Sequence, residues 1–167
     1  GGSLPWLAAA ALVLIMLGGW WTSVRQTVQQ DLAERTPEEL REILLAEGED
    51  VLLTPLTATA DPSAADAGGE VSWSPLLQTG YMTIVGLEPN DPAQSQYQLW
   101  IFDATRDERF PVDGGVFDVP AGADEVVIPI DAKIEVREAT LFAITVEKPG
   151  GVVVSDRERI VLVAQPE

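Results

Sequence analysis

Residues 97–103 read YQLWIFD. The centre of this segment, from Gln98 to Phe102, is a nearly continuous run of large apolar side chains. Aromatic and β-branched side chains favour strands, and a strand without polar alternation is buried on both faces. The sequence therefore predicts a central β-strand at Tyr97–Asp103, with partner strands before and after it along the chain.

Short β-rich runs alternate with turn residues on both sides of this segment, which is typical of an all-β domain. The expected partner strands are Val51–Thr57, Val71–Ser74, Tyr81–Leu87, Gly115–Val119, Glu125–Ile130, Leu141–Glu147, Val152–Val154 and Ile160–Ala164. Asp113–Gly115 and Pro149–Gly151 predict tight turns, and Asp61–Gly69 predicts a mobile loop. We expect residues 51–167 to form an antiparallel β-sandwich, so the fold class is mainly β.

Residues 22–50 predict a juxtamembrane helical stalk. Residues 22–35 carry one narrow apolar stripe on an otherwise polar helix. A second helix is expected from Pro37 to Glu47, because Thr36 can cap it, Pro37 suits a first helical turn and Glu39 completes a capping box. Gly48 then ends the helix.

Residues 4–21 read LPWLAAAALVLIMLGGWW, 18 residues without a charged, hydroxyl or amide side chain. A helix of this length rises about 27 Å, close to the hydrocarbon thickness of a bilayer. Tryptophan at both ends suits the two membrane interfaces. We predict a transmembrane helix over 4–21, whose marker residues are Leu4, Trp6, Leu12, Ile15, Leu17, Trp20 and Trp21.

Two other interpretations of this stretch are a buried helix of a soluble core and a signal peptide. An all-apolar helix is uncommon in a domain this small, and a signal peptide would need a basic start and a cleavage site, neither of which is present. Residues 1–3, Gly-Gly-Ser, are interpreted as a cloning remnant, so we expect the native protein to begin upstream of Leu4.

The composition excludes several classes of site. The 167 residues include 10 Lys and Arg against 27 Asp and Glu, a formal net charge of −17, with no Cys and no His. Thiol chemistry, the usual zinc sites and a Ser-His-Asp triad are therefore excluded. A chain this acidic is also unsuited to a phosphate backbone, so nucleic acid is not an expected partner. Residues 1–24 carry no charge, so the acidity belongs to the rest of the chain.

No catalytic constellation emerges from the remaining residues, and we expect neither an enzyme nor a cofactor. Asp103–Glu108 spaces oxygen ligands as in a calcium loop, but Glu108 replaces the glycine at the sixth position, so a solvated hairpin loop is favoured. Lys133 and Lys148 are the lysines available to a Ser-Lys pair, and no motif supports one. Phe110-Pro111 with Trp73 and Trp100 could line a pocket, although aromatic residues in strands are more often core.

Five segments occur in a distinctive order: VSWSP (71–75), YMTIVGLEP (81–89), YQLWIFD (97–103), GGVFDV (114–119) and ITVEKPGG (144–151). Their order and spacing resemble the C-terminal domain of the anti-sigma-K factor (RskA) family. The preceding REILLAEGEDVLLTPL (41–56) and the apolar stretch also suit the family. The family-motif residues are Trp73, Tyr97, Leu99, Trp100, Thr145, Glu147, Gly150 and Gly151.

The resemblance implies a single-pass bacterial membrane protein that regulates transcription negatively. A cytoplasmic segment, absent from this chain, would hold an extracytoplasmic-function sigma factor inactive, and the C-terminal domain would lie outside the cytoplasm. Regulated proteolysis by membrane proteases would release the sigma factor. The expected partners are therefore membrane lipid, a sigma factor and membrane proteases, but not nucleic acid.

Gly18 and Gly19 lower helix propensity near one end of the predicted span. Our hypothesis is that this end unwinds and becomes the intramembrane cleavage region once the β-domain is removed. The alternative is that the glycines pack against another helix. Two other functions also stay open: a membrane-anchored adhesion or assembly module, and a secreted hydrolase with paired carboxylates.

Overall fold

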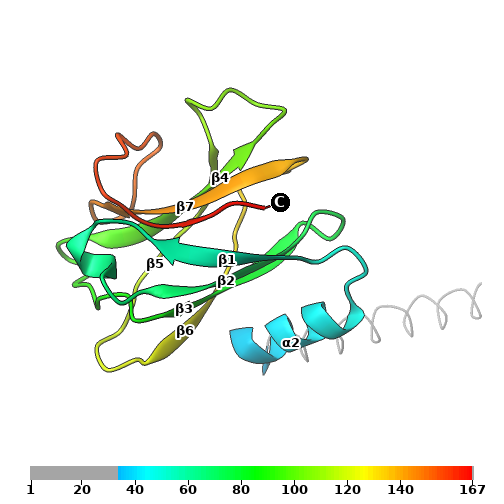
Figure 1. Ribbon diagram of the computed structural model, residues 1–167, viewed down its shortest axis with the longest axis horizontal. Helices are drawn as coiled ribbons and strands as arrows, with labels where there is room; N and C mark the ends of the chain where they lie inside the picture. Colours follow the sequence, from blue (N-terminus) through cyan, green and yellow to red (C-terminus); the bar gives the residue numbers. More distant parts are fainter. Residues whose placement is uncertain (1–33, 167) are drawn as a thin grey trace, which may run out of the picture. The chain divides into compact units, whose positions relative to one another are not determined.

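The computed structural model describes residues 34–166, and the compact unit discussed below begins at Pro37 (Figure 1). Its elements follow one another as helix α2, strand β1, the 3-10 helix η1 and strands β2 to β8. Their bounds are α2 Pro37–Glu47, β1 Leu52–Ala58, η1 Pro62–Ala64, β2 Gly68–Ser74, β3 Thr79–Val85, β4 Gln96–Asp103, β5 Val112–Phe117, β6 Glu125–Pro129, β7 Ala139–Glu147 and β8 Ile160–Ala164.

Several predictions fall outside the described residues. They are the cloning remnant at 1–3, the membrane span at 4–21 with Gly18 and Gly19, and the first part of the stalk, residues 22–33. Within residues 34–166, no helix combines the length and the apolar composition needed to cross a bilayer.

The eight strands form one antiparallel sheet in the order β5-β4-β7-β8-β1-β2-β3-β6. Strand β1 is the joint between two halves, since it pairs with β2 over Leu52–Thr57 but with β8 only at Thr57 and Ala58. In Figure 1 the half that contains β4 and β7 lies above the half that contains β1, β2, β3 and β6. The central position of β4 between β5 and β7 confirms the prediction for YQLWIFD.

The predicted sandwich of two separate sheets is replaced by a nearly closed, barrel-like sheet. At the far edge from the β1–β8 joint, the segment after β6 reaches β5. The Asp131 N–H donates to the Gly114 carbonyl at 2.9 Å, and the Lys133 N–H donates to the Asp113 carbonyl at 3.0 Å. The mainly β, antiparallel class is confirmed. The two halves are joined by backbone hydrogen bonds at both sides, between β1 and β8 and between β5 and the segment after β6.

The core lies between the two halves. Trp73 of β2 and Phe142 of β7 are fully buried and meet edge to face, with ring centroids 6.4 Å apart. This pair links residues that are far apart in the sequence, and it packs among aliphatic side chains from both halves. These include Leu56, Val71, Met82, Ile84, Leu99, Ile101, Ile144 and Leu162.

Three local predictions were wrong. Asp113–Gly115 lies inside β5 rather than in a turn. Glycine is needed at residue 114 for close packing, since a Cβ there would lie 2.6 Å from the Leu99 side chain. Val152–Val154 is not a strand but part of the β7–β8 loop. The segment predicted as a mobile loop after Asp61 contains η1, buries Ala64 and is tied to Arg159 through Asp61 at 2.8 Å.

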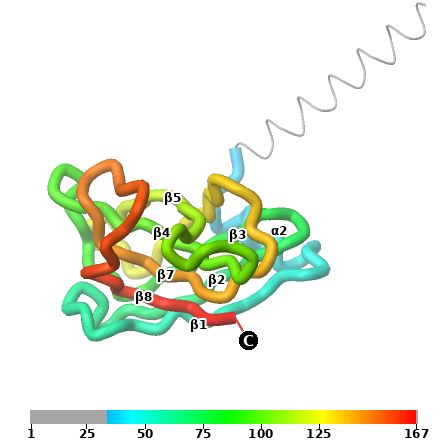
Figure 2. Tube along the Cα trace, turned by 90° about the horizontal axis from the view of Figure 1, so that it is seen from above, coloured from blue at the N-terminus to red at the C-terminus, as the bar shows by residue number. Residues whose placement is uncertain are grey.

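Helix α2 has the predicted bounds and contacts β3 and β6. Figure 2 shows it beside β3, viewed from above. The helix ends where the Gly48 N–H donates to the Leu44 carbonyl at 2.8 Å. A Cβ at Gly48 would lie 2.6 Å from that same carbonyl oxygen, so the close approach requires glycine. The stretch predicted as a stalk thus includes a helix that packs on the sheet.

Candidate functional site

Strand β4 buries side chains on both of its faces. Tyr97, Leu99 and Ile101 point into the core, whereas Gln98 and Trp100 lie on the opposite face and are still only 1% and 2% exposed. What covers this second face is the loop between β7 and β8, residues 148–159, which we call the covering loop. A loop of this length between antiparallel neighbours is longer than a hairpin needs. The face of β4 and β7 together with the covering loop is our candidate functional site.

A chain of hydrogen bonds runs from Trp100 to the covering loop. The Trp100 indole Nε1–H donates to the Thr145 Oγ1 at 2.9 Å, and the Thr145 hydroxyl donates to the Glu147 carboxylate at 2.7 Å. The same Glu147 oxygen accepts a hydrogen bond from the Ser155 hydroxyl of the covering loop. Thr145 is 1% exposed, so its hydroxyl and the indole N–H are both buried. Their hydrogen bond avoids the free-energy cost of leaving buried polar groups unpaired.

Gln98 fixes the first half of the covering loop with its side-chain amide. Its Oε1 accepts the Val152 N–H at 2.9 Å, and its Nε2 donates to the Val152 carbonyl at 3.0 Å. The Nε2 also donates to the Asp113 carboxylate of β5 at 3.2 Å. The Gln98 amide therefore bonds both the N–H and the carbonyl of Val152, as a neighbouring strand would. Because these backbone groups are satisfied by a side chain, Val152–Val154 binds to β4 without joining the sheet.

The two glycines of the predicted Pro149–Gly151 turn both have positive φ, 83° at Gly150 and 70° at Gly151. The Gly150 N–H donates to the Gln96 Oε1 at 2.8 Å. A Cβ at Gly151 would lie 2.6 Å from the Val116 side chain and 2.7 Å from the Gln98 Oε1, whereas one at Gly150 would meet nothing within 4 Å. Both glycines are thus needed for their positive φ. Gly151 is also needed because the backbone there lies too close to Val116 and Gln98 to leave room for a Cβ.

Alanine at these two positions should separate the two effects. We expect Gly150→Ala to cost about 1–2 kcal/mol through left-handed strain. Gly151→Ala should cost about 1–3 kcal/mol more, because its Cβ also pushes the covering loop off Gln98. Urea titrations of both variants measure the difference, and equal losses would mean that the loop does not dock as tightly as the contacts indicate.

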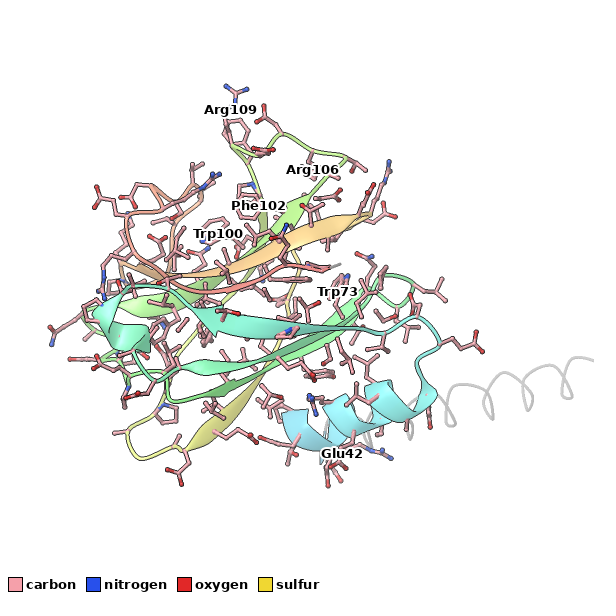
Figure 3. The ribbon with its side chains drawn as sticks, in the orientation of Figure 1. Glu42, Trp73, Trp100, Phe102, Arg106 and Arg109 are labelled. Atoms are coloured by element: carbon pink, nitrogen blue, oxygen red, sulfur yellow. The ribbon has the colours of Figure 1, made fainter. Side chains whose placement is uncertain are left out.

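The second half of the covering loop is held by Arg157. Its guanidinium lies over the Phe102 ring, 5.0 Å from the centroid, and its Nη2 donates to the Glu108 carbonyl in the β4–β5 loop. Figure 3 shows Trp100 and Phe102 next to each other on β4. Arg157 has a φ of 60°, an uncommon conformation for a residue other than glycine. The covering loop therefore bridges β4, β7 and the β4–β5 loop.

The structure brings five of the family-motif residues together at this site: Trp100, Thr145, Glu147, Gly150 and Gly151. The other three lie elsewhere. Trp73 and Leu99 are core residues, and Tyr97 stacks on Phe117 with centroids 5.7 Å apart and donates its hydroxyl hydrogen to the Glu88 carbonyl at 2.8 Å. Burial raises the pKa of the Tyr97 phenol.

Gln96, Gln98, Ser155 and Arg157 also belong to the site, although no sequence motif marks them. Gln98 offered one usable signal, as a polar residue within an apolar strand. Gln96 directly precedes the predicted strand, and the neighbours of Ser155 and Arg157 in the covering loop cannot be inferred from spacing.

The Asp103–Glu108 segment is organised by its own hydrogen bonds. Asp103 is 6% exposed and accepts bonds from the Thr105 N–H, the Thr105 hydroxyl and the Arg137 N–H, each at 2.8 Å. Burial alone would raise the pKa of Asp103, but these bonds to its charged form lower it. Across residues 34–166, no group of three or more carboxylates is placed to hold a metal ion.

The aromatic residues do not gather into a shared pocket, and the favoured interpretation of strand aromatics as buried residues holds for Trp73 and Trp100. Trp73 and Trp100 are buried, and Phe110 is 55% exposed. Pro111 lines a shallow groove of about 530 Å³ beside Phe102 and Leu141, which also contains Arg106 and Asp107. Asp107 is already paired with Arg109 at 2.5 Å.

One family model matches the chain, over residues 6–156, and its description is anti-sigma-K factor rskA, C-terminal. No curated protein and no solved structure matches the chain. The matched range includes the candidate site except residues 157–159 of the covering loop, and it begins within the predicted membrane span.

Proposed function

The chain belongs to the anti-sigma-K factor family through its C-terminal domain, and on this premise we propose that it is the outer part of a membrane-anchored anti-sigma factor. In this proposal residues 4–21 cross the cytoplasmic membrane and the β-domain lies outside the cytoplasm. A cytoplasmic segment upstream of Leu4 restrains an extracytoplasmic-function sigma factor, and so represses transcription.

The observation that carries the proposal is the extent of the family match. It runs from residue 6 to residue 156, across both the apolar stretch and most of the β-domain. The acidic surface also supports it, since a net charge of −17 suits a solvated domain and not one that binds DNA itself. Action by restraint is further supported by the polar side chains of the candidate site, which are engaged with one another.

We propose that the sigma factor is released by regulated proteolysis, with Gly18 and Gly19 as the intramembrane cleavage region. A helix in a bilayer resists proteases because its backbone groups are hydrogen-bonded and buried. Two adjacent glycines weaken such a helix locally.

The test is co-purification of a sigma factor with the full-length native protein, including its upstream segment. We expect the sigma factor to be recovered with full-length protein and lost with residues 4–167 alone. We also expect transcription from its promoters to rise when the gene is deleted. If full-length protein recovers no sigma factor and deletion leaves transcription unchanged, the chain serves instead as a membrane-anchored adhesion or assembly module.

A further inference from the structure

Helix α2 is held to the sheet by few apolar contacts. Of its residues only Leu44 is buried, at 6% exposure, and Leu40 and Ile43 are partly exposed. Figures 1 and 2 show the helix lying along one side of the sheet rather than between its two halves. Because stability follows buried apolar area, this element belongs to the least stable part of the unit.

An ion pair joins α2 to strand β2. Arg41 is the one basic residue of α2, which also carries four glutamates, and its Nη2 lies 2.7 Å from the Glu70 carboxylate of β2. Two buried atoms at this contact, the Arg41 Nε and the Thr83 Oγ1, have no hydrogen-bond partner among the described residues. Thr83 is the cross-strand neighbour of Glu70. The Arg41 Nε would regain water if α2 moved away, so its unmet hydrogen bond weakens the docked state.

The chain after α2 is firmly anchored. The Asp50 carboxylate accepts the Ser74 hydroxyl and the Leu76 N–H, each at 2.6 Å. These bonds lower the pKa of Asp50, so it stays charged at neutral pH. Gly48 and Glu49 lie between the end of the helix and this anchor. A movement of α2 would therefore turn about Gly48–Glu49 and leave β1 in place.

We infer that α2 is a latch helix, which leaves the sheet as a unit by pivoting at Gly48–Glu49 while the eight strands stay folded. The Arg41–Glu70 ion pair sets the balance between the docked and released states. The open edge of β1 is a weaker candidate for a functional surface, because Pro55 lies on it and lacks the N–H that an added strand would need. The latch concerns the fold alone and stands whether or not the proposed function does.

Pulsed electron–electron spin resonance on the full chain in detergent micelles can test the latch. The chain contains no cysteine, so two introduced cysteines carry both spin labels. One label replaces Glu42, which points away from the sheet in Figure 3, and the other replaces the exposed Glu125 of β6. The matched control pair, Thr57→Cys with Glu125→Cys, reports on the strands alone.

In this background Arg41→Glu should raise the population of long Glu42–Glu125 distances by up to about fivefold, since a partly exposed pair is lost. The control pair should not change. Exchanging the charges in Arg41→Glu with Glu70→Arg should restore the original distribution. An unchanged Glu42–Glu125 distribution in Arg41→Glu would overturn the inference. So would a broadened control pair, because α2 would then be an integral part of the folded core.

Discussion

Replacing Trp100 with alanine is expected to lower the free energy of unfolding by about 3–5 kcal/mol. The side chain is 2% exposed and lies between β4 and the covering loop, so its removal leaves a large cavity. It also removes the indole N–H that the Thr145 hydroxyl oxygen accepts at 2.9 Å. A loss of this size is a large share of the roughly 5–15 kcal/mol that stabilises a typical domain.

A double-mutant cycle separates the ring of Trp100 from its hydrogen bond. Trp100→Phe keeps most of the ring and leaves Thr145 without its donor. Thr145→Val removes the acceptor and leaves a buried indole N–H unpaired. Each change should cost about 1–3 kcal/mol, and the double variant should cost less than their sum because both partners are gone. Urea titration of the four proteins in the same detergent measures the coupling, and strictly additive losses would show that the bond contributes nothing.

The elements that could be predicted from the sequence are those whose signals are local. The capped start at Thr36-Pro37 and the glycine at residue 48 define α2, and the β-rich runs at 97–103 and 160–164 define β4 and β8. The joining of the two halves could not be predicted, because it depends on β1 pairing with strands on both sides. The same limit explains the error at Asp113–Gly115, where glycine serves close packing on Leu99 rather than a turn.

The candidate site was predictable only in part. Trp100, Thr145 and Glu147 were selected through the family resemblance, and the structure joins them by direct hydrogen bonds. Ser155, the partner of Glu147, and Val152, the partner of Gln98, both lie in the covering loop, and nothing in a single sequence relates that loop to β4. A long-range polar contact of this kind depends on how loops fold back over strands, which residue spacing does not encode.

Replacing Asp103 with asparagine is expected to cost about 1.5–3 kcal/mol at neutral pH, as is usual for hydrogen bonds to a buried charged group. The carboxylate accepts bonds from the Thr105 N–H, the Thr105 hydroxyl and the Arg137 N–H, and so links the β4–β5 loop to the segment before β7. An amide would place an NH₂ group against these donors. Asp107→Asn is the matched control, since that exposed carboxylate pairs with Arg109 on the surface, and its effect should lie within experimental error.

The pH dependence of the same variant gives the sharper test. The pKa of Asp103 is lower in the folded chain than the ordinary value of about 3.9. Its contribution is therefore fully present above that value, and it is lost as the pH falls through the lowered folded pKa. The stabilities of wild type and Asp103→Asn should differ at pH 7 and converge in acid. Because other carboxylates titrate equally in both proteins, the difference isolates Asp103, and a difference that does not change with pH would mean that its charge is not what these donors stabilise.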